Sequence, residues 1–253
     1  LFISDSIKKG GLPDDIVQKL QDIENAIQRN KNNPYKGNYL KHQEVAMANN
    51  GMLDEPLDTP YFDYDVITTE GPNEGIYASY MAEFRLVEFG PDFDLDCFFD
   101  MTVVAHEINH AIQDIKVRES VVKSDSKAQY ANYFERYLVG QQGLATKINL
   151  DDEFESYSIS LELINQRSGG LLKEAAKAGA FDNIQKNFHD YKNRNANYKN
   201  EEERRKFTEE LVTYVFNKST NPEACFKLFE ESGANTDGKV FGFIYALELA
   251  AEY

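Results

Sequence analysis

Three absences narrow what this chain can be. The sequence has 2 cysteines in 253 residues, too few for a disulfide-stapled scaffold, so Cys97 and Cys225 are expected to be buried free thiols. No apolar run approaches the roughly 20 residues that a membrane-spanning helix needs, and we expect no membrane span. Residues 1–30 are too polar for a cleavable signal peptide, and the sequence assigns no localisation.

Positive charge is also scarce. The chain carries 27 Lys and Arg against 43 Asp and Glu, which gives a formal net charge of -16. Nucleic-acid backbones and anionic membranes are themselves negative, so neither is expected as the main partner. A basic substrate is compatible with this charge, and the oligomeric state stays open.

The length and the apolar content predict one large domain. With 42% hydrophobic residues in 253, the chain can bury a substantial core. Hydrophobic periodicity predicts a helix over residues 13–29, after a loose entry over 1–12, and a mostly helical C-terminal part over about 171–253. Residues 30–75 are rich in Asn, Pro, Gly and Asp, which predicts an irregular segment where His42 is a surface residue.

The centre of the sequence carries a metal-ligand pattern, His-Glu-x-x-His, at residues 106–110. On a helix, residues four apart lie one turn apart on the same face, so His106 and His110 can direct two imidazole nitrogens at one metal ion. Glu107 follows the first of them and can accept a proton from a water that the metal activates. The pattern therefore predicts hydrolytic zinc chemistry, with two His ligands and Glu107 as general base.

The surroundings of the pattern favour a helix. No Gly or Pro interrupts residues 101–118, and Asp100 is a plausible N-cap. A core-facing stripe has helical spacing: Val104, Ile108, Ala111 and Ile115. The competing interpretation is a helix whose two His residues merely cap or pack. A chance pairing is less expected in a chain with only 4 His.

A strand is predicted before this helix. Residues 76–87 alternate between apolar and more polar side chains, and a loop over 90–96 leads into the helix. If the strand lies at a sheet edge, its free backbone groups can bind an extended peptide; the alternative is an amphipathic strand packed on the core.

A catalytic zinc ion needs a third protein ligand. Gln113 and Lys116 occupy the places where the extended metzincin motif has Gly and His, which argues against that class. A carboxylate from a later helix is the expected source. The candidates are Glu119, Glu135, Glu153 and Glu155, with Asp114 and His189 as more remote options.

We favour Glu155, because small residues flank it and would let its helix approach the helix of the His pair closely. Asp151 or Asp152 is expected to cap the start of that helix. Glu135 and Glu153 stay open as alternatives. The small residues beside Glu155 are Ser156, Ser158 and Ser160.

With a Glu on a later helix, the His-Glu-x-x-His segment resembles the zincin metallopeptidases of the gluzincin type, over about residues 75–165. The resemblance implies an α+β fold, mostly helical with a small sheet before the motif helix, within a single zincin-like domain spanning 1–253. It implies zinc (Zn2+) on His106, His110 and Glu155, Glu107 as general base, and a peptide or protein substrate. Many gluzincins carry Asp four residues after the third ligand. This chain has Ile159 there, so the motif does not identify the support for a zinc-bound His.

Peptide-bond hydrolysis is the expected function. The tetrahedral oxyanion needs a donor, for which Tyr157, Tyr191 and His189 are candidates, and Asp114 is expected to face solvent. One alternative is a non-catalytic, zinc-stabilised helical interaction protein. Another is a zinc hydrolase of a non-peptide amide. The presence of Glu107 favours catalysis, because a purely structural zinc site has no use for that carboxylate.

Overall fold

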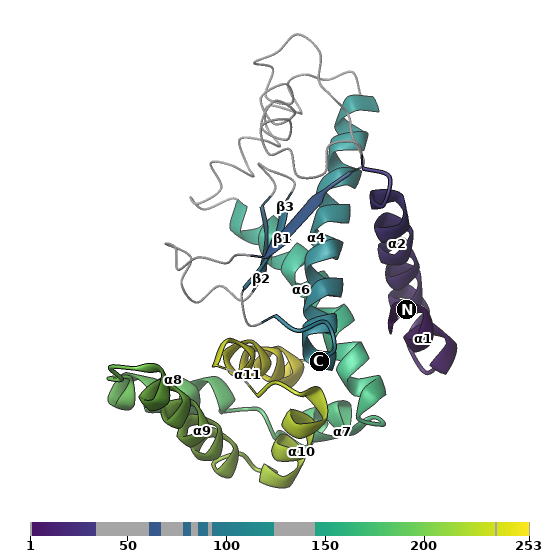
Figure 1. Cartoon of the computed structure of the whole chain (residues 1–253). Helices are drawn as coiled ribbons and strands as arrows, with labels where there is room; N and C mark the ends of the chain where they lie inside the picture. Colours follow the sequence, from purple (N-terminus) through teal and green to yellow (C-terminus); the bar gives the residue numbers. More distant parts are fainter. Residues whose placement is uncertain are drawn as a thin grey trace.

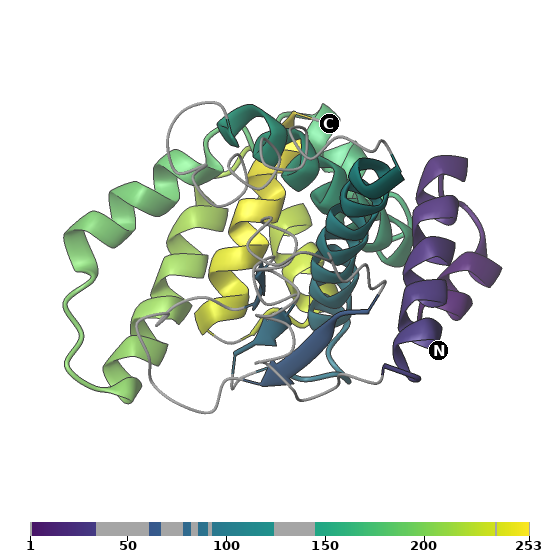
Figure 2. The ribbon, with the colours of Figure 1, turned by 90° about the horizontal axis from the view of Figure 1, so that it is seen from above.

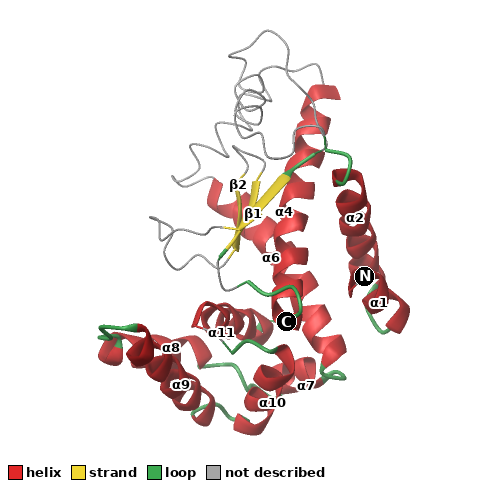
Figure 3. Cartoon of the chain, viewed as in Figure 1, coloured by secondary structure: helices red, strands yellow, loops and turns green. Residues whose placement is uncertain are grey.

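The architecture is α+β and mainly helical, as the sequence predicts. In the part of the chain that the computed structural model describes, there are nine helices and three strands (Figure 3). The predictions on His42 and Glu135 fall outside the described residues, and the side chain of the candidate ligand Glu119 is not described. The described residues are 2–33, 61–66, 78–81, 86–90, 93–123, 145–235 and 237–252. For 63–66, 117–123, 145–150 and 237 only the backbone is described.

The long helix α4 (Phe98–Lys123) lies at the centre, between α2 (Asp14–Asn30) and the sheet (Figure 1). Of the predicted stripe, Ile108, Ala111 and Ile115 are buried, whereas Val104 is only partly buried against the core. The N-cap prediction is wrong, because α4 begins before Asp100. The Asp100 carboxylate instead accepts a hydrogen bond from the Asp94 N–H at 2.6 Å and contacts the Lys239 ammonium at 2.9 Å.

The N-terminal residues form a helical pair beside α4. The predicted loose entry is instead a helix, α1 (Phe2–Lys9), and a turn through Gly10 and Gly11, both at positive φ, leads to α2. Pro13 precedes the first residue of α2, where its missing N–H costs nothing. Helix α2 confirms the helix predicted over residues 13–29, and its apolar residues Ile16, Leu20 and Ile23 are buried.

The sheet has the order β1-β3-β2, with β1 (Asp63–Val66) parallel and β2 (Ala78–Met81) antiparallel to β3 (Leu86–Phe89). The single strand predicted over residues 76–87 is therefore wrong, because the chain reverses between Met81 and Leu86. Residues 82–85 contain no Gly or Pro, so the alternating pattern carries no signal of the reversal. Tyr80 pairs with Val87, and these two side chains share the face that packs on α4.

The C-terminal part is helical, as predicted. Helix α6 extends further than expected and contains Asp151 and Asp152, so neither residue caps its start. The caps of two later helices are formed by Asn200 and Asn221, whose side chains accept backbone N–H groups. The elements are α6 (Ala145–Arg167), α7 (Leu171–Lys177), α8 (Ile184–Asn195), α9 (Glu201–Asn217), α10 (Pro222–Ser232) and α11 (Asp237–Ala251), which pack as Figure 2 shows.

The core consists of two hydrophobic clusters, and α6 contributes to both from opposite faces. Ile159 and Leu163 pack with α1, α2, the sheet and α4. Leu161 and Ile164 pack with the start of α4 and with α7 to α11. Cys97 and Cys225 are free thiols. None of the described helices is long and apolar enough to cross a membrane.

Candidate metal centre

His106 and His110 lie one turn apart on α4 and point at the same spot, as the spacing predicts. Their Nε2 atoms are 3.0 Å apart, and the ring planes meet at 77° with centroids 4.7 Å apart. Both residues are nearly buried, at 6% and 9% exposure. Two imidazole nitrogens held this close can bind the same metal ion.

The third group is Glu153 of α6. Its carboxylate oxygens lie 3.4 Å from the Nε2 of His106 and 3.4 Å from the Nε2 of His110. Three ligand bonds of roughly 2.1 Å that meet at the tetrahedral angle place donor atoms about 3.4 Å apart. The two 3.4 Å separations, which run to different oxygens of Glu153, are of this size, the Nε2 atoms are closer at 3.0 Å, and the donor types suit a metal ion. Among the described residues, His106, His110 and Glu153 form the group that could hold one.

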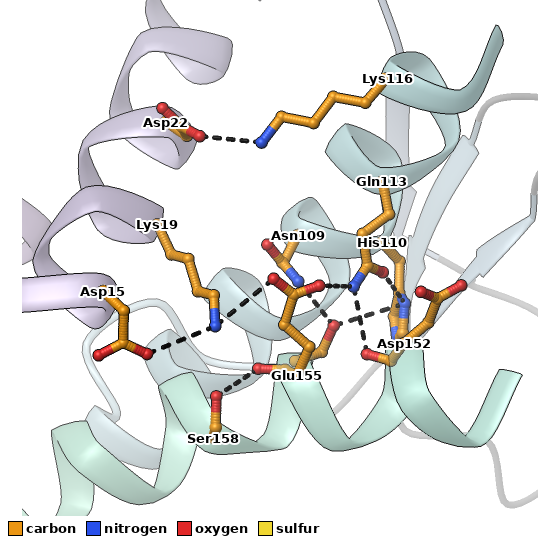
Figure 4. Close-up of polar contacts among 11 residues, drawn as sticks. Asp15, Lys19, Asp22, Asn109, His110, Gln113, Lys116, Asp152, Glu155 and Ser158 are labelled. Carbon is orange, nitrogen blue, oxygen red and sulfur yellow. Dashed lines mark hydrogen bonds and ion pairs between the residues drawn. The ribbon is translucent and has the colours of Figure 1, made fainter. Parts of the chain in front are cut away.

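Glu155, the favoured third ligand, is not brought to this group. Its carboxylate accepts a hydrogen bond from Gln113 at 2.6 Å and lies 3.4 Å from the Lys19 ammonium on α2 (Figure 4). Side chains two positions apart on a helix point in directions that differ by roughly 160°. Glu153 and Glu155 therefore face different neighbours. Glu153 faces the His pair, whereas Glu155 turns toward α2.

The close approach of α6 to α4 explains why Glu153 reaches the His pair. The Asn109 side-chain amide donates to Ser156 Oγ at 2.9 Å, and Ser160 Oγ donates to the Thr102 carbonyl at 3.0 Å. Both serines are buried, and Glu153 precedes them along the same side of α6. The spacing of the small residues, Ser156 and Ser160 but not Ser158, was the sequence signal that could have selected Glu153.

Glu107 lies beside this group and is nearly buried, at 7% exposure. Burial raises the pKa of its carboxyl, and the neighbouring His106 and His110 partly oppose that rise. The backbone N–H of Tyr80 on β2 donates a hydrogen bond to the carboxylate, which holds it in place. A buried carboxylate whose pKa is raised is suited to accept and return a proton.

Asp114 does not face solvent, which corrects the prediction for this residue. It is 1% exposed, and its carboxylate accepts a hydrogen bond from the Tyr80 hydroxyl at 2.8 Å. Asp114 lies two turns after Glu107 on the side of α4 that faces β2. Tyr80 thus contacts α4 twice, through its hydroxyl and through its backbone N–H.

Of the three candidate oxyanion donors, the structure brings Tyr157 to the His pair. Its ring packs edge-on against His106 with centroids 4.4 Å apart, and Tyr245 of α11 packs behind it at 5.2 Å. Burial raises the pKa of Tyr157, so the hydroxyl keeps its proton and can donate. Tyr191 and His189 lie on α8, where Tyr191 donates to Glu210 and His189 packs on Phe188.

The charges within the group are coupled. Burial raises the pKa of Glu153, but its contacts with His106 and His110 outweigh burial and hold that pKa well below its usual range. For His110, burial lowers the pKa, while Glu153, Glu107 and Gln113 raise it, with a net increase. A carboxylate that stays ionised beside two imidazoles is the donor set that zinc favours.

Replacing Glu153 tests the ligand set directly. Glu153→Ala removes one of three donors, and we expect zinc affinity to fall by more than about 100-fold, beyond the usual effect of losing a group outside the coordination shell. Glu155→Ala is the matched control on the same helix, since it keeps all three donors, and its loss should be at least tenfold smaller. The dissociation constants are measured by chelator competition. An equal or larger loss for Glu155→Ala would return Glu155 to the ligand set.

Comparison with protein-family models, with curated proteins and with solved structures gives no match to this chain. The resemblance to gluzincins therefore rests on the motif residues and on their geometry. The structure supports its coarser part, a group of two His and one Glu that could hold a metal ion.

Proposed function

We propose that this protein is a zinc-dependent metallopeptidase. The observation that carries the proposal is the convergence of His106, His110 and Glu153, with separations of 3.0, 3.4 and 3.4 Å, beside the buried Glu107. Three protein donors leave the fourth tetrahedral position open, as in catalytic zinc sites. When bound there, zinc supplies a Lewis acid and lowers the pKa of water.

The residues around the donors have distinct roles in the proposed reaction. Glu107 accepts the proton of the attacking water and delivers it to the leaving amine. The Tyr80 N–H fixes the position of that carboxylate. The Tyr157 hydroxyl is the proposed donor to the oxyanion, because this residue packs on His106 and retains its proton.

Strand β2 is the proposed binding site for the backbone of the substrate. In the described sheet it is an edge strand, since it pairs with β3 alone. The Tyr80 N–H on this strand points at Glu107, so the strand borders the reacting position. An extended peptide can add to such an edge through main-chain hydrogen bonds, which favours a peptide over a non-peptide amide.

Metal content is the first test of the proposed function. We expect about one zinc per chain in the purified protein, because the donor set is complete, and loss of that zinc in His110→Ala. Elemental mass spectrometry measures both, and circular dichroism confirms that the variant is folded. The metal-loaded protein should then cleave members of a random peptide library. No zinc after reconstitution would reduce the His pair to a packing contact.

A non-catalytic structural zinc site is the second candidate. It is favoured by the position of the donors, which would join α4 to α6. Structural zinc sites normally have four protein ligands, however, and the group found among the described residues has three. The two candidates differ in the need for Glu107, because hydrolysis requires a general base and a structural zinc site does not.

A further inference from the structure

We infer that Gln113 is a positioning residue that fixes the tautomer of His110, and that Glu155 and Lys19 hold Gln113 in that role. The inference rests on the proposed metal site. It assigns a support for the zinc-binding imidazole at a place where the motif provides none. The four residues form one continuous chain of polar contacts from α4 across α6 to α2 (Figure 4).

The orientation of the Gln113 amide follows from its neighbours. One end of the amide lies 2.6 Å from Glu155 Oε2 and 3.3 Å from the Asp152 carbonyl oxygen. An ionised carboxylate and a carbonyl only accept hydrogen bonds, so this end is the NH₂ group. The other end, the amide oxygen, therefore faces His110 and can only accept a hydrogen bond.

The tautomer of His110 follows from the amide. The Gln113 oxygen lies 2.9 Å from His110 Nδ1, so Nδ1 carries the proton and donates it. In the neutral imidazole, Nε2 then presents its lone pair toward His106 and Glu153, where a metal ligand atom is needed. Ser156 Oγ lies further from Nδ1, at 3.5 Å, and a hydroxyl can donate or accept, so it does not select the tautomer.

The far end of the chain of contacts keeps Glu155 in place. Its second carboxylate oxygen lies 3.4 Å from Lys19 Nζ, and Lys19 is also 3.8 Å from Asp15 one turn earlier on α2. The Lys19 and Glu155 side chains are 23% and 40% exposed. Solvent weakens an ion pair of this kind, so the effect of each residue should decrease with its distance from His110.

The test combines zinc affinity with a direct observation of the tautomer. Gln113→Met removes both hydrogen bonds at similar side-chain size, and Lys19→Met removes the outer anchor without touching a residue of the metal group. With only 4 His in the chain, the imidazole nitrogens can be assigned by proton–nitrogen correlation NMR of the full-length protein. Zinc dissociation constants are measured by chelator competition.

We expect His110 to be protonated at Nδ1 in the metal-free wild type at a pH where its imidazole is neutral. Gln113→Met should mix the two tautomers and weaken zinc binding by about 10- to 100-fold, the usual effect of losing such a partner. Lys19→Met should weaken it by less than about tenfold. The double variant Gln113→Glu/Glu155→Gln exchanges acceptor and donor, and it should restore the Nδ1–H tautomer and most of the affinity.

The inference is overturned if His110 is protonated at Nε2 in the wild type, or if Gln113→Met leaves both the tautomer and the zinc affinity unchanged. It is also overturned if the double variant Gln113→Glu/Glu155→Gln behaves like Gln113→Met, because its acceptor at position 113 should restore the Nδ1–H tautomer. If the wild type binds no zinc, the proposed function fails, and the NMR result alone then decides the role of Gln113.

Discussion

Glu107→Gln should abolish peptide hydrolysis while the protein keeps its metal. The substituted side chain has nearly the same size, and its carbonyl oxygen can still accept the Tyr80 N–H. An amide cannot take a proton from water, so the general base is lost. Such bases contribute about 100- to 10,000-fold, and we expect kcat/KM to fall by at least about 100-fold. The measurement is cleavage of a peptide selected from the library.

The metal content of the same variant is the control. Glu107 is not one of the three converging donors, so about one zinc per chain should remain. The substitution also places a neutral group where burial disfavours the charged one, so the variant should be no less stable than the wild type. Hydrolytic activity that survives Glu107→Gln would contradict the proposed mechanism. If the zinc-loaded wild type also fails to hydrolyse peptides, the result would favour a structural zinc site.

Lys239→Met should destabilise the fold by about 3–5 kcal/mol, the usual effect of removing one partner of a buried ion pair. The Lys239 ammonium lies 2.9 Å from the Asp100 carboxylate, and the side chains are 4% and 0% exposed. The substitution leaves a fully buried carboxylate beside an apolar side chain, without the nearby positive charge. Urea unfolding followed by circular dichroism measures the change in the free energy of unfolding.

Lys116→Met is the matched control for this effect. Lys116 lies 3.0 Å from Asp22, a nearly identical separation, but these side chains are 64% and 32% exposed. Exposed pairs of this kind contribute about 0–1 kcal/mol. The double variant Asp100→Asn/Lys239→Met removes both buried charges and should recover much of the loss. If Lys239→Met costs no more than Lys116→Met, burial is not what makes the inner pair important.

The sequence predicts the part of the site that lies on one helix. The separation of His106 and His110 is set by helical geometry alone, and the structure confirms that they converge. The identity of the third group depends on how α6 is rotated against α4. That rotation is decided by contacts between distant residues, such as Asn109 with Ser156. The serines around Glu155 lie on more than one face of α6, so their presence alone does not say which face meets α4, and the face that does carries Glu153.

The same limit applies to the strands and to Asp114. Residues 76–87 alternate as one strand would, and the reversal between β2 and β3 leaves no Gly or Pro in the sequence. An Asp one turn after a ligand is usually solvated, and its burial becomes understandable only with the Tyr80 hydroxyl at 2.8 Å. Helices are easier to predict, because their apolar stripes are local, although both predicted N-caps, at Asp100 and at Asp151 or Asp152, are wrong because each helix begins earlier.

The contribution of α6 to both hydrophobic clusters sets a limit on how far the chain can be shortened. A fragment excised at residues 75–165 would retain His106, His110 and Glu153. It would also turn Leu161 and Ile164 to water on one face of α6, because their partners on α7 to α11 would be missing. On the other face, Ile159 would lose its partners on α1 and α2. The candidate metal site is consequently not independent of the rest of the fold, and transplanting it into another scaffold would require both faces of α6 to be rebuilt.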